Sequence, residues 1–261
     1  MKLLLTILFV LPLVLVAQET PLPTKSKFHL FLLVGQSNMA GRGEISDADR
    51  KPDSRVLMLN QEGRWVAAVD PLHFDKPAMV GVGLGRTFGL TVAEAEPGIT
   101  VGLIPCAVGG SPIDSWMPGA LDKATKTHPW DDAMKRAHLA LSSGTLKGIL
   151  WHQGESDATP GLAPAYEEKL VDLVNRLRVE LDVPEVPFLL GQLGAFAGKP
   201  WSAEYKIVDQ AHQSLVNRVQ NAAFVSSSGL MDKGDHVHFD APSYREFGRR
   251  YAEVYLKLVK K

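Results

Sequence analysis

The sequence has little of what marks a disulfide-stapled protein, a nucleic-acid-binding protein or a membrane-spanning protein. It contains a single cysteine, Cys106, which cannot form an internal disulfide, so a folded core has to supply the stability. With 28 Lys and Arg against 29 Asp and Glu, the formal net charge is −1, and nucleic acid is therefore a poor candidate partner. The apolar run at residues 3–16 is shorter than the ~20 residues that a spanning helix needs.

The first residues predict an export signal. Lys2 supplies a positive start, residues 3–16 are almost entirely apolar, and the small residue Ala17 precedes a polar stretch, which is the order typical of a signal peptide. We therefore predict a signal peptide at residues 1–17 and a linker at residues 18–27. The protein would then be secreted or periplasmic, with no membrane contact after the signal is removed. An uncleaved membrane anchor is the alternative.

After the linker, apolar β-rich runs alternate with amphipathic helical stretches. The predicted strands are residues 28–34, 55–59, 100–104, 146–151, 186–191 and 222–226, and the predicted helices are residues 131–141, 166–181, 204–219 and 243–258. Several strands are apolar on both faces, as in a parallel sheet that is covered on both sides. The alternation implies right-handed crossovers. The sequence thus predicts a single α/β domain at residues 28–261 with a mostly parallel, doubly wound sheet.

In such a sheet the functional residues follow the strands at their carboxyl ends. The segment GQSNMAGRG, residues 35–43, follows the first predicted strand. A serine on a glycine-flanked strand-to-helix turn exposes its hydroxyl and leaves its backbone N–H free, which a nucleophile requires. Ser37 is therefore a candidate nucleophile. The spacing is not that of G-x-S-x-G, and a serine in such a turn is more often a helix cap.

A glycine-rich segment, AVGGS at residues 107–111, follows the third predicted strand. Paired glycines let backbone amides approach a ligand closely and donate to an oxyanion, although a plain turn has the same composition. Asp114 and Trp116 follow nearby and could shape a pocket for sugar.

The segment WHQGESD, residues 151–157, follows the fourth predicted strand. A run of polar and aromatic side chains is costly to bury without a purpose. Gln153 can donate an amide hydrogen to an oxyanion, and Glu155 can act as an acid, a base or an orienting group. A polar loop that caps the next helix is the alternative.

The segment DHVHFD, residues 235–240, precedes the last predicted helix. Asp235 lies three residues before His238 and can reach its Nδ1 atom, which would fix the tautomer and stabilise the imidazolium. The alternative is a metal site, since His236 and His238 would share a face of an extended strand with Asp240 adjacent. Two surface histidines in an acidic loop are the third possibility.

Together these segments resemble one family. The blocks at residues 35–41, 109–111 and 151–155, with Asp235-x-x-His238-Phe239, resemble the acetyl xylan esterase and sialate O-acetylesterase-like branch of the SGNH hydrolases. The resemblance covers nearly the whole mature chain. It implies a three-layer α/β/α sandwich of the SGNH or flavodoxin-like kind. It also implies removal of acetyl groups from sugars, for example in xylan, sialic acid or related glycans, without a cofactor.

The resemblance also assigns roles to individual residues. It implies that Ser37 is the nucleophile, His238 the base and Asp235 its orienting acid. The oxyanion hole would consist of the backbone N–H groups of Ser37 and Gly110 and the side chain of Gln153, which stands where the wider superfamily has Asn. Glu155 remains an alternative partner for the histidine. Asp235 is favoured over Glu155 because it lies only three residues from His238, so bringing the two together costs little loop-closure entropy.

The leading hypothesis is a secreted serine esterase that hydrolyses O-acetyl esters of carbohydrate through an acetyl-enzyme, with no cofactor and no metal. The alternatives are a metal-dependent hydrolase built on the cluster at residues 236–240, and a non-catalytic carbohydrate-binding protein. The residues that we expect to contact the substrate are Gln36, Asn38, Gly109, Asp114 and Trp116.

Overall fold

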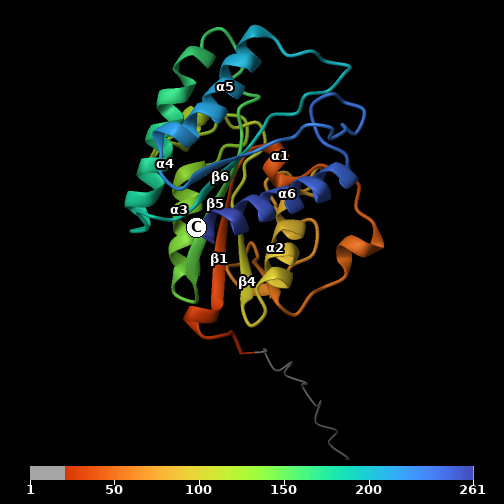
Figure 1. Cartoon of the computed structure of the whole chain (residues 1–261), viewed down its shortest axis with the longest axis vertical. Helices are drawn as coiled ribbons and strands as arrows, with labels where there is room; N and C mark the ends of the chain where they lie inside the picture. The colour runs from red at the N-terminus through yellow and green to blue at the C-terminus, as the bar shows by residue number, and fades with distance from the viewer. Residues whose placement is uncertain (1–20, 261) are drawn as a thin grey trace, which may run out of the picture.

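The computed structural model describes residues 21–260, and its helices surround one central sheet (Figure 1). The seven strands have the order β3-β2-β4-β1-β5-β6-β7. The strands are β1 (Phe28–Gly35), β2 (Val56–Leu59), β3 (Trp65–Ala67), β4 (Thr100–Pro105), β5 (Thr145–His152), β6 (Phe188–Gly191) and β7 (Ala222–Val225). The α-helices are α1 (Ser37–Ala40), α2 (Leu84–Ala95), α3 (Pro129–Leu141), α4 (Tyr166–Glu180), α5 (Ala203–Arg218) and α6 (Ala241–Val259). Short 3-10 helices are η1 (Lys25–Lys27), η2 (Asp47–Arg50), η3 (Ile113–Trp116) and η4 (Ala163–Ala165).

Strand β1 lies at the centre of the sheet, between the parallel strands β4 and β5. Its side chains alternate between two cores, with Leu30 and Leu32 in one and Phe31 and Leu33 in the other. This alternation follows from the two-residue period of a strand. Both faces are covered, and apart from His29 near its start the strand contains no polar side chain. The sequence-based prediction of a sheet buried on both sides is therefore confirmed.

The helices form the two outer layers. Apolar side chains of α3, α4 and α5 belong to the core on one face of the sheet, whereas those of α2 and α6 belong to the core on the other face (Figure 1). Among the strands formed by residues 21–260, only β3 runs antiparallel to its neighbour. The predicted three-layer α/β/α sandwich with a mostly parallel sheet is therefore confirmed.

The last helix, α6, shows how local sequence produces this packing. Asp240 caps the helix by accepting a hydrogen bond from the N–H of Ser243 at 2.8 Å, and Pro242 occupies the first turn, where a proline loses no helical bond. Tyr244, Phe247 and the later aromatic residues on the same face are buried.

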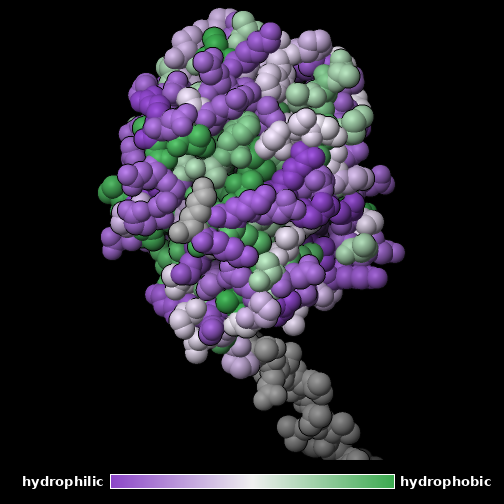
Figure 2. Space-filling view, in the orientation of Figure 1, coloured by the Kyte–Doolittle hydropathy of each residue, from purple (hydrophilic) through white to green (hydrophobic). Residues whose placement is uncertain are grey.

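Hydrophilic side chains cover much of the face of the molecule in view, with smaller apolar areas between them (Figure 2).

Strand β3 and helix α2 were not predicted from the sequence, nor were the short 3-10 helices. The start of α2 is rich in glycine, which disfavours helix. The glycines serve packing instead: a Cβ at Gly89 would lie 2.9 Å from Cγ1 of Val56, and a Cβ at Gly248 of α6 would overlap the carbonyl oxygen of Leu84. Close contact between α2, the sheet and α6 therefore outweighs helix propensity here.

The predicted signal peptide at residues 1–17 lies outside the described residues, as does the first part of the predicted linker. Within residues 21–260, no helix is long and apolar enough to cross a membrane.

Candidate active site

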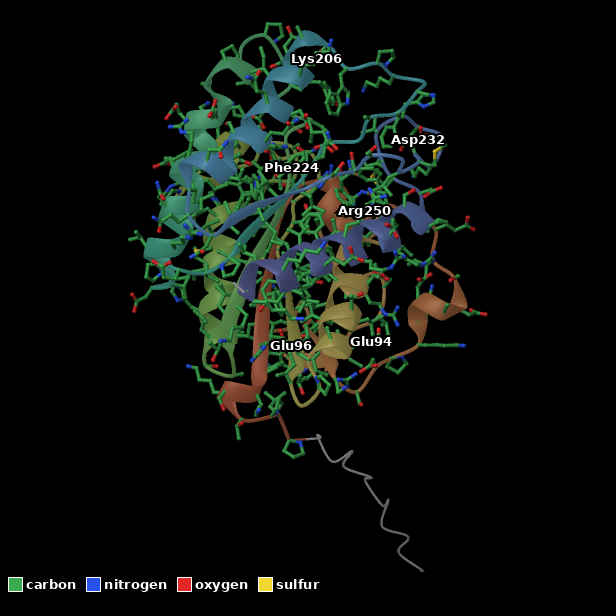
Figure 3. All side chains as sticks on the ribbon, in the orientation of Figure 1. Glu94, Glu96, Lys206, Phe224, Asp232 and Arg250 are labelled. Atoms are coloured by element: carbon green, nitrogen blue, oxygen red, sulfur yellow. The ribbon has the colours of Figure 1, made fainter. Side chains whose placement is uncertain are left out.

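The segments singled out in the sequence meet at one edge of the sheet. Strands β1, β4 and β5 are parallel, so the loops that follow them leave at the same edge. The loop before α6 reaches this edge as well. Figure 3 shows it near the labelled Asp232, far from the labelled Glu96, which follows the end of α2 and precedes β4.

Ser37 begins the short helix α1 directly after β1. The turn that carries it depends on Gly35, whose φ is 132° and whose missing Cβ would overlap the backbone of His152. Only glycine combines this backbone conformation with such a close approach between the ends of two strands. The sequence therefore fixes the serine at the carboxyl end of the central strand, where it is 7% exposed.

Ser37, His238 and Asp235 form a hydrogen-bonded chain. Oγ of Ser37 lies 3.0 Å from Nε2 of His238, and Nδ1 of the same ring lies 2.7 Å from Oδ2 of Asp235. The other carboxylate oxygen accepts the backbone N–H groups of Val237 and His238, at 2.9 and 2.8 Å. Because a carboxylate at Nδ1 keeps the ring proton there, Nε2 is free to accept the proton of the serine hydroxyl.

Burial and hydrogen bonds shift the pKa values of His238 and Asp235. Burial lowers the pKa of His238 below its usual range, and the hydrogen bond and charge of Asp235 oppose that shift. For Asp235, partial burial acts to raise the pKa, but the hydrogen bonds from the backbone and ring of His238 outweigh it, so the pKa is lowered. At neutral pH the pair is therefore a neutral imidazole beside a carboxylate.

Two backbone N–H groups near Ser37 are available to a ligand. Within residues 21–260, those of Ser37 and Gly110 have no hydrogen-bond partner. Gly110 is exposed and has a φ of 83°, which is a conformation that favours glycine. The neighbouring N–H of Gly109 donates to Oδ2 of Asp75 at 2.7 Å, so this predicted substrate contact is already engaged within the protein.

Gln153 does not have a free amide hydrogen. Its side chain is fully buried, and Nε2 donates to the carbonyl of Ser111 at 3.1 Å and to the carboxylate of Asp157. Its amide oxygen accepts the hydroxyl of Tyr166 at 2.8 Å. The expectation that this side chain donates to an oxyanion is therefore at odds with the structure, since both of its hydrogens are used in the core.

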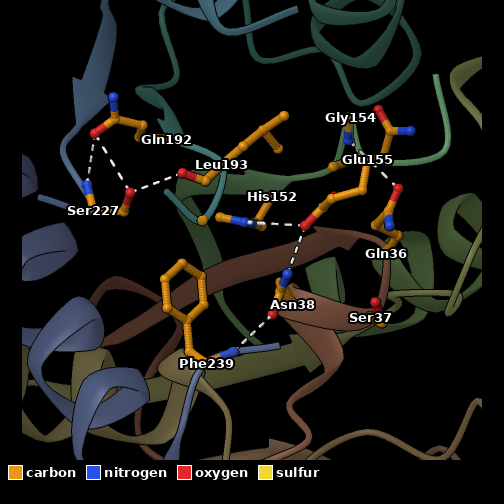
Figure 4. A network of polar contacts seen from close by, with 12 residues as sticks. Gln36, Ser37, Asn38, His152, Gly154, Glu155, Gln192, Leu193, Ser227 and Phe239 are labelled. Atoms are coloured by element: carbon orange, nitrogen blue, oxygen red, sulfur yellow. Dashed lines mark hydrogen bonds and ion pairs between the residues drawn. The ribbon is translucent and has the colours of Figure 1, made fainter. Parts of the chain in front are cut away.

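Asn38 and Glu155 form a buried network beside the serine (Figure 4). Nδ2 of Asn38 donates to Oε1 of Glu155 at 2.5 Å and to the carbonyl of Val237 at 3.0 Å, and its Oδ1 accepts the hydroxyl of Tyr244 at 2.6 Å. Burial raises the pKa of Glu155, and the hydrogen bond from Asn38 opposes that shift. The structure thus brings Asp235 to the ring of His238 and directs Glu155 to Asn38 instead.

Three further predicted substrate contacts can be compared with their positions. Trp116 is fully buried, with Nε1 donating to Oγ of Ser111 at 3.0 Å and its ring packed edge-on against Trp151. Asn38 is also fully buried. Both side chains are thus engaged within the protein, and their contact with sugar stays a prediction. Asp114 is exposed and pairs with Lys169 at 2.7 Å.

Gln36 is 2% exposed, and its amide oxygen accepts the N–H groups of Gly154 and Ser156, both at 3.4 Å. It joins the turn after β1 to the turn after β5. This position supports the geometry of the serine turn.

The residues of the alternative metal site have separate partners. His236 contacts Asp232 at 3.1 Å, His238 contacts Ser37 and Asp235, and Asp240 caps α6. Among the described residues, no group of three or more His, Cys, Asp or Glu side chains is arranged to hold a metal ion. The alternation of the two histidines in sequence therefore does not produce a shared ligand set.

Sequence reasoning missed one ion pair at the site. Nη2 of Arg42 lies 2.9 Å from Oδ2 of Asp75, and both side chains are 2% exposed. The charge of Arg42 also contributes to lowering the pKa of His238. Arg42 lies within residues 35–43, the segment around Ser37 that the sequence had already indicated. Asp75 lies in an irregular loop with no periodicity or motif to indicate it.

The fold is that of the SGNH and GDSL hydrolases. A GDSL-like lipase from Parabacteroides merdae, described as putative, matches with a TM-score of 0.55 and 14% identity over 92% of this chain and 99% of that one. The chain belongs to the family described as "Carbohydrate esterase, sialic acid-specific acetylesterase", whose model matches residues 27–257. The resemblance inferred from the motifs is thereby confirmed.

Several known proteins are similar. A protein of Arabidopsis thaliana named "Probable carbohydrate esterase At4g34215" is 29% identical over 260 residues, which is 91% of this chain and 93% of the relative. Its crystal structure has a TM-score of 0.78 over 90% of this chain and 99% of that chain. The crystal structure of NanS matches with a TM-score of 0.74 and 16% identity, over 92% of this chain and 99% of that chain. The structure of XAC1771, a carbohydrate acetylesterase of Xanthomonas citri, matches with a TM-score of 0.65 and 22% identity, over 88% of this chain and 56% of that chain. The last two likenesses concern the fold alone.

Proposed function

We propose that this chain is a serine esterase that hydrolyses O-acetyl esters of carbohydrate through an acetyl-enzyme. Its family supports hydrolysis of O-acetyl esters on carbohydrate. The observation that carries the serine mechanism is the chain of contacts from Oγ of Ser37 to Nε2 of His238 at 3.0 Å and from Nδ1 to Asp235 at 2.7 Å. A nucleophile, a base and an orienting acid in this order are the parts of acyl transfer.

In the first step, Nε2 of His238 takes the proton of the Ser37 hydroxyl as Oγ attacks the acetyl carbonyl carbon. The oxygen of the tetrahedral intermediate accepts the backbone N–H groups of Ser37 and Gly110, each of which contributes roughly 3 kcal/mol to such a transition state. The carbon–oxygen bond to the sugar then breaks, and His238 donates its proton to the departing alcohol. Acetyl remains esterified to Ser37.

In the second step, water repeats the sequence on the acetyl-enzyme. His238 takes a proton from the water as the water oxygen attacks the acetyl carbonyl carbon. The bond between this carbon and Oγ of Ser37 then breaks, and His238 returns the proton to Oγ. Acetate leaves and the free enzyme is restored. Asp235 keeps the ring in the required tautomer in both steps.

The proposal extends to location and partners. Residues 1–17 act as a signal peptide, residues 18–27 as a linker and residues 28–261 as one esterase domain, so the mature protein is secreted or periplasmic. Its partner is an acetylated carbohydrate such as xylan, a sialic acid or a related glycan, with no nucleic acid and no membrane. Expression with the native leader and amino-terminal sequencing of the exported protein test this part: a mature chain that still begins at Met1 would contradict it.

Acetate release from p-nitrophenyl acetate and from acetylated xylan tests the mechanism. Wild type, Ser37→Ala and the control Ser227→Ala, another buried serine, are compared with and without EDTA. We expect activity in wild type and control that survives EDTA, and loss of nearly all turnover in Ser37→Ala. Activity that survives Ser37→Ala and disappears with EDTA would instead favour the metal-dependent alternative.

A further inference from the structure

The N–H of Gly110, which the proposed function uses as an oxyanion donor, lies in a turn whose tip has few constraints of its own. The turn is anchored at its base, where the N–H of Val108 donates to the carbonyl of Gly35 at 2.9 Å. At the tip, neither the N–H of Gly110 nor the carbonyl of Gly109 has a hydrogen-bond partner within residues 21–260. A peptide between two glycines rotates freely, because no Cβ restricts it. An oxyanion donor is effective when its direction is fixed before the reaction, so this peptide needs support from its neighbours.

Side chains hold the peptides on both sides of this one. The N–H of Gly109 donates to Oδ2 of Asp75 at 2.7 Å. The carbonyl of Gly110 accepts the hydroxyl of Ser156 at 2.9 Å. Asp75 comes from the irregular loop before α2, and Ser156 comes from the turn after β5. Because the peptide groups before and after it are held, the peptide between the two glycines has little freedom to turn its N–H away.

Arg42 connects Asp75 to the serine turn. Nη2 of Arg42 donates to the same oxygen of Asp75 at 2.9 Å, and Nη1 donates to the carbonyl of Gly41 at 2.8 Å. The N–H of Gly41 in turn donates to the carbonyl of Ser37 at 2.9 Å. One set of contacts therefore links the two turns that carry the proposed oxyanion donors. The guanidinium also balances the charge of Asp75, which would otherwise repel the negative charge that forms on the substrate.

The direction of the Gly110 N–H matters in this chain because Gln153 supplies no free donor. Both amide hydrogens of Gln153 are used in the core, by Ser111 and Asp157, so the proposed oxyanion hole depends on two backbone N–H groups. That of Ser37 lies at the start of α1, whereas that of Gly110 lies outside any helix or strand. The second donor therefore depends on side-chain contacts for its alignment.

We propose that Asp75 and Ser156 are positioning residues that aim the N–H of Gly110 at the oxyanion, and that Arg42 balances the charge of Asp75. The inference rests on the proposed esterase function. In the described part of the chain, neither side chain is hydrogen-bonded to the proposed nucleophile or base, so both act on the transition state through the glycine turn. Their loss lowers kcat and leaves KM nearly unchanged, because the affected contact forms only in the transition state.

The first test removes the hydroxyl that holds the carbonyl of Gly110. For Ser156→Ala we expect kcat on p-nitrophenyl acetate to fall about tenfold to a hundredfold with little change in KM, which is the effect of a misaligned oxyanion donor. Ser156→Thr keeps the hydroxyl and should restore most of the activity. The control is Ser214→Ala, which removes another half-buried hydroxyl that donates to a backbone carbonyl, that of Ala211 at 3.2 Å.

The second test changes the other side of the turn. In Asp75→Asn the amide oxygen still accepts from Gly109 but Arg42 loses its countercharge, so we expect a smaller fall in kcat than in Asp75→Ala, which removes both contacts. Breaking a buried ion pair also destabilises the fold. The control Asp49→Asn therefore breaks another pair with a buried carboxylate, that with Arg245 at 2.7 Å, and should leave kcat per folded molecule unchanged.

Inhibition by trifluoroacetone separates positioning from loss of folded protein. Addition of Ser37 to this ketone forms a tetrahedral adduct with an oxyanion, so its Ki should rise in the variants by the same factor by which kcat/KM falls. Partial unfolding lowers kcat and leaves Ki unchanged, and that result would overturn the proposal. Wild-type kcat in Ser156→Ala or in Asp75→Ala overturns it as well, while the esterase function stands. A wild-type protein that hydrolyses no acetyl ester removes the proposed function itself.

Discussion

Asn38 is held by Glu155 through a hydrogen bond of 2.5 Å between Nδ2 and Oε1. The second hydrogen of the same amide binds the carbonyl of Val237 at 3.0 Å. Asn38 adjoins Ser37, and Val237 adjoins His238, so one side chain ties the nucleophile to the loop that carries the proposed base. This relationship gives Glu155 a positioning role in place of direct contact with the histidine.

The first prediction concerns Glu155. We expect Glu155→Gln to keep kcat on p-nitrophenyl acetate within about tenfold, because the amide oxygen still accepts from Asn38, and Glu155→Leu to lose more activity and stability. A buried donor left unpaired costs about 1–3 kcal/mol. Thermal unfolding and steady-state kinetics of the two variants provide the measurement. A loss of several thousandfold in Glu155→Gln would make this residue the partner of His238 instead.

The second prediction concerns Asp235. Asp235→Asn keeps the size of the side chain but favours the wrong tautomer of His238, and the analogous change in a serine protease lowers kcat about 10⁴-fold. We expect a fall of about 10³–10⁴-fold in kcat. The control is Asp232→Asn, which alters the partner of His236 in the same loop. Near-normal turnover in Asp235→Asn would contradict the assigned chain of contacts.

The third prediction is the pH dependence of kcat/KM. A general base acts only when it is neutral, so activity falls as pH drops through the pKa of the histidine. Burial lowers the pKa of His238 below its usual 6.5, and Asp235 opposes that shift. The acid limb should therefore lie below pH 6.5, and in Asp235→Asn it should move lower still. A limb at or above pH 6.5, or one that moves upward in the variant, would be inconsistent with this environment.

The fourth prediction concerns stability and Asp70. This carboxyl is 3% exposed, burial raises its pKa to about 7, and the charge of Arg86 opposes the shift. Its folded pKa lies above the ordinary aspartate value of 3.8, so the native state binds the proton more tightly than the unfolded chain does. The stability it contributes is complete below about pH 4 and is lost as pH rises through about 7. Urea unfolding at pH 5 and pH 8 should show a smaller difference in Asp70→Asn than in wild type; an equal difference would refute the assignment.

Much of the fold was visible in the sequence because its signals are local. The unbroken apolar run from Leu30 to Leu33 can be recognised from neighbouring residues alone, and it predicted a strand that is covered on both faces. The glycine-flanked turn after that strand placed Ser37 correctly at the carboxyl edge. Helix α2 was missed because its glycines disfavour a helix when the local sequence is considered alone. Their role is close packing against other elements, such as Val56 of β2, which the local sequence does not reveal.

What the sequence determined by itself is most of the strands and helices along the chain, without β3 and α2, together with the residues that follow each predicted strand and the family. What only the tertiary structure decided is which of these residues meet. Ser37 and His238 are 201 residues apart in the chain, and the choice between Asp235 and Glu155 depends on how two distant loops close over one another. The same holds for Gln153 and Trp116, whose polar atoms have partners in the core. Composition and spacing specify which groups can bond, but burial and loop closure select the partners, because each buried donor has to find an acceptor in the packed structure.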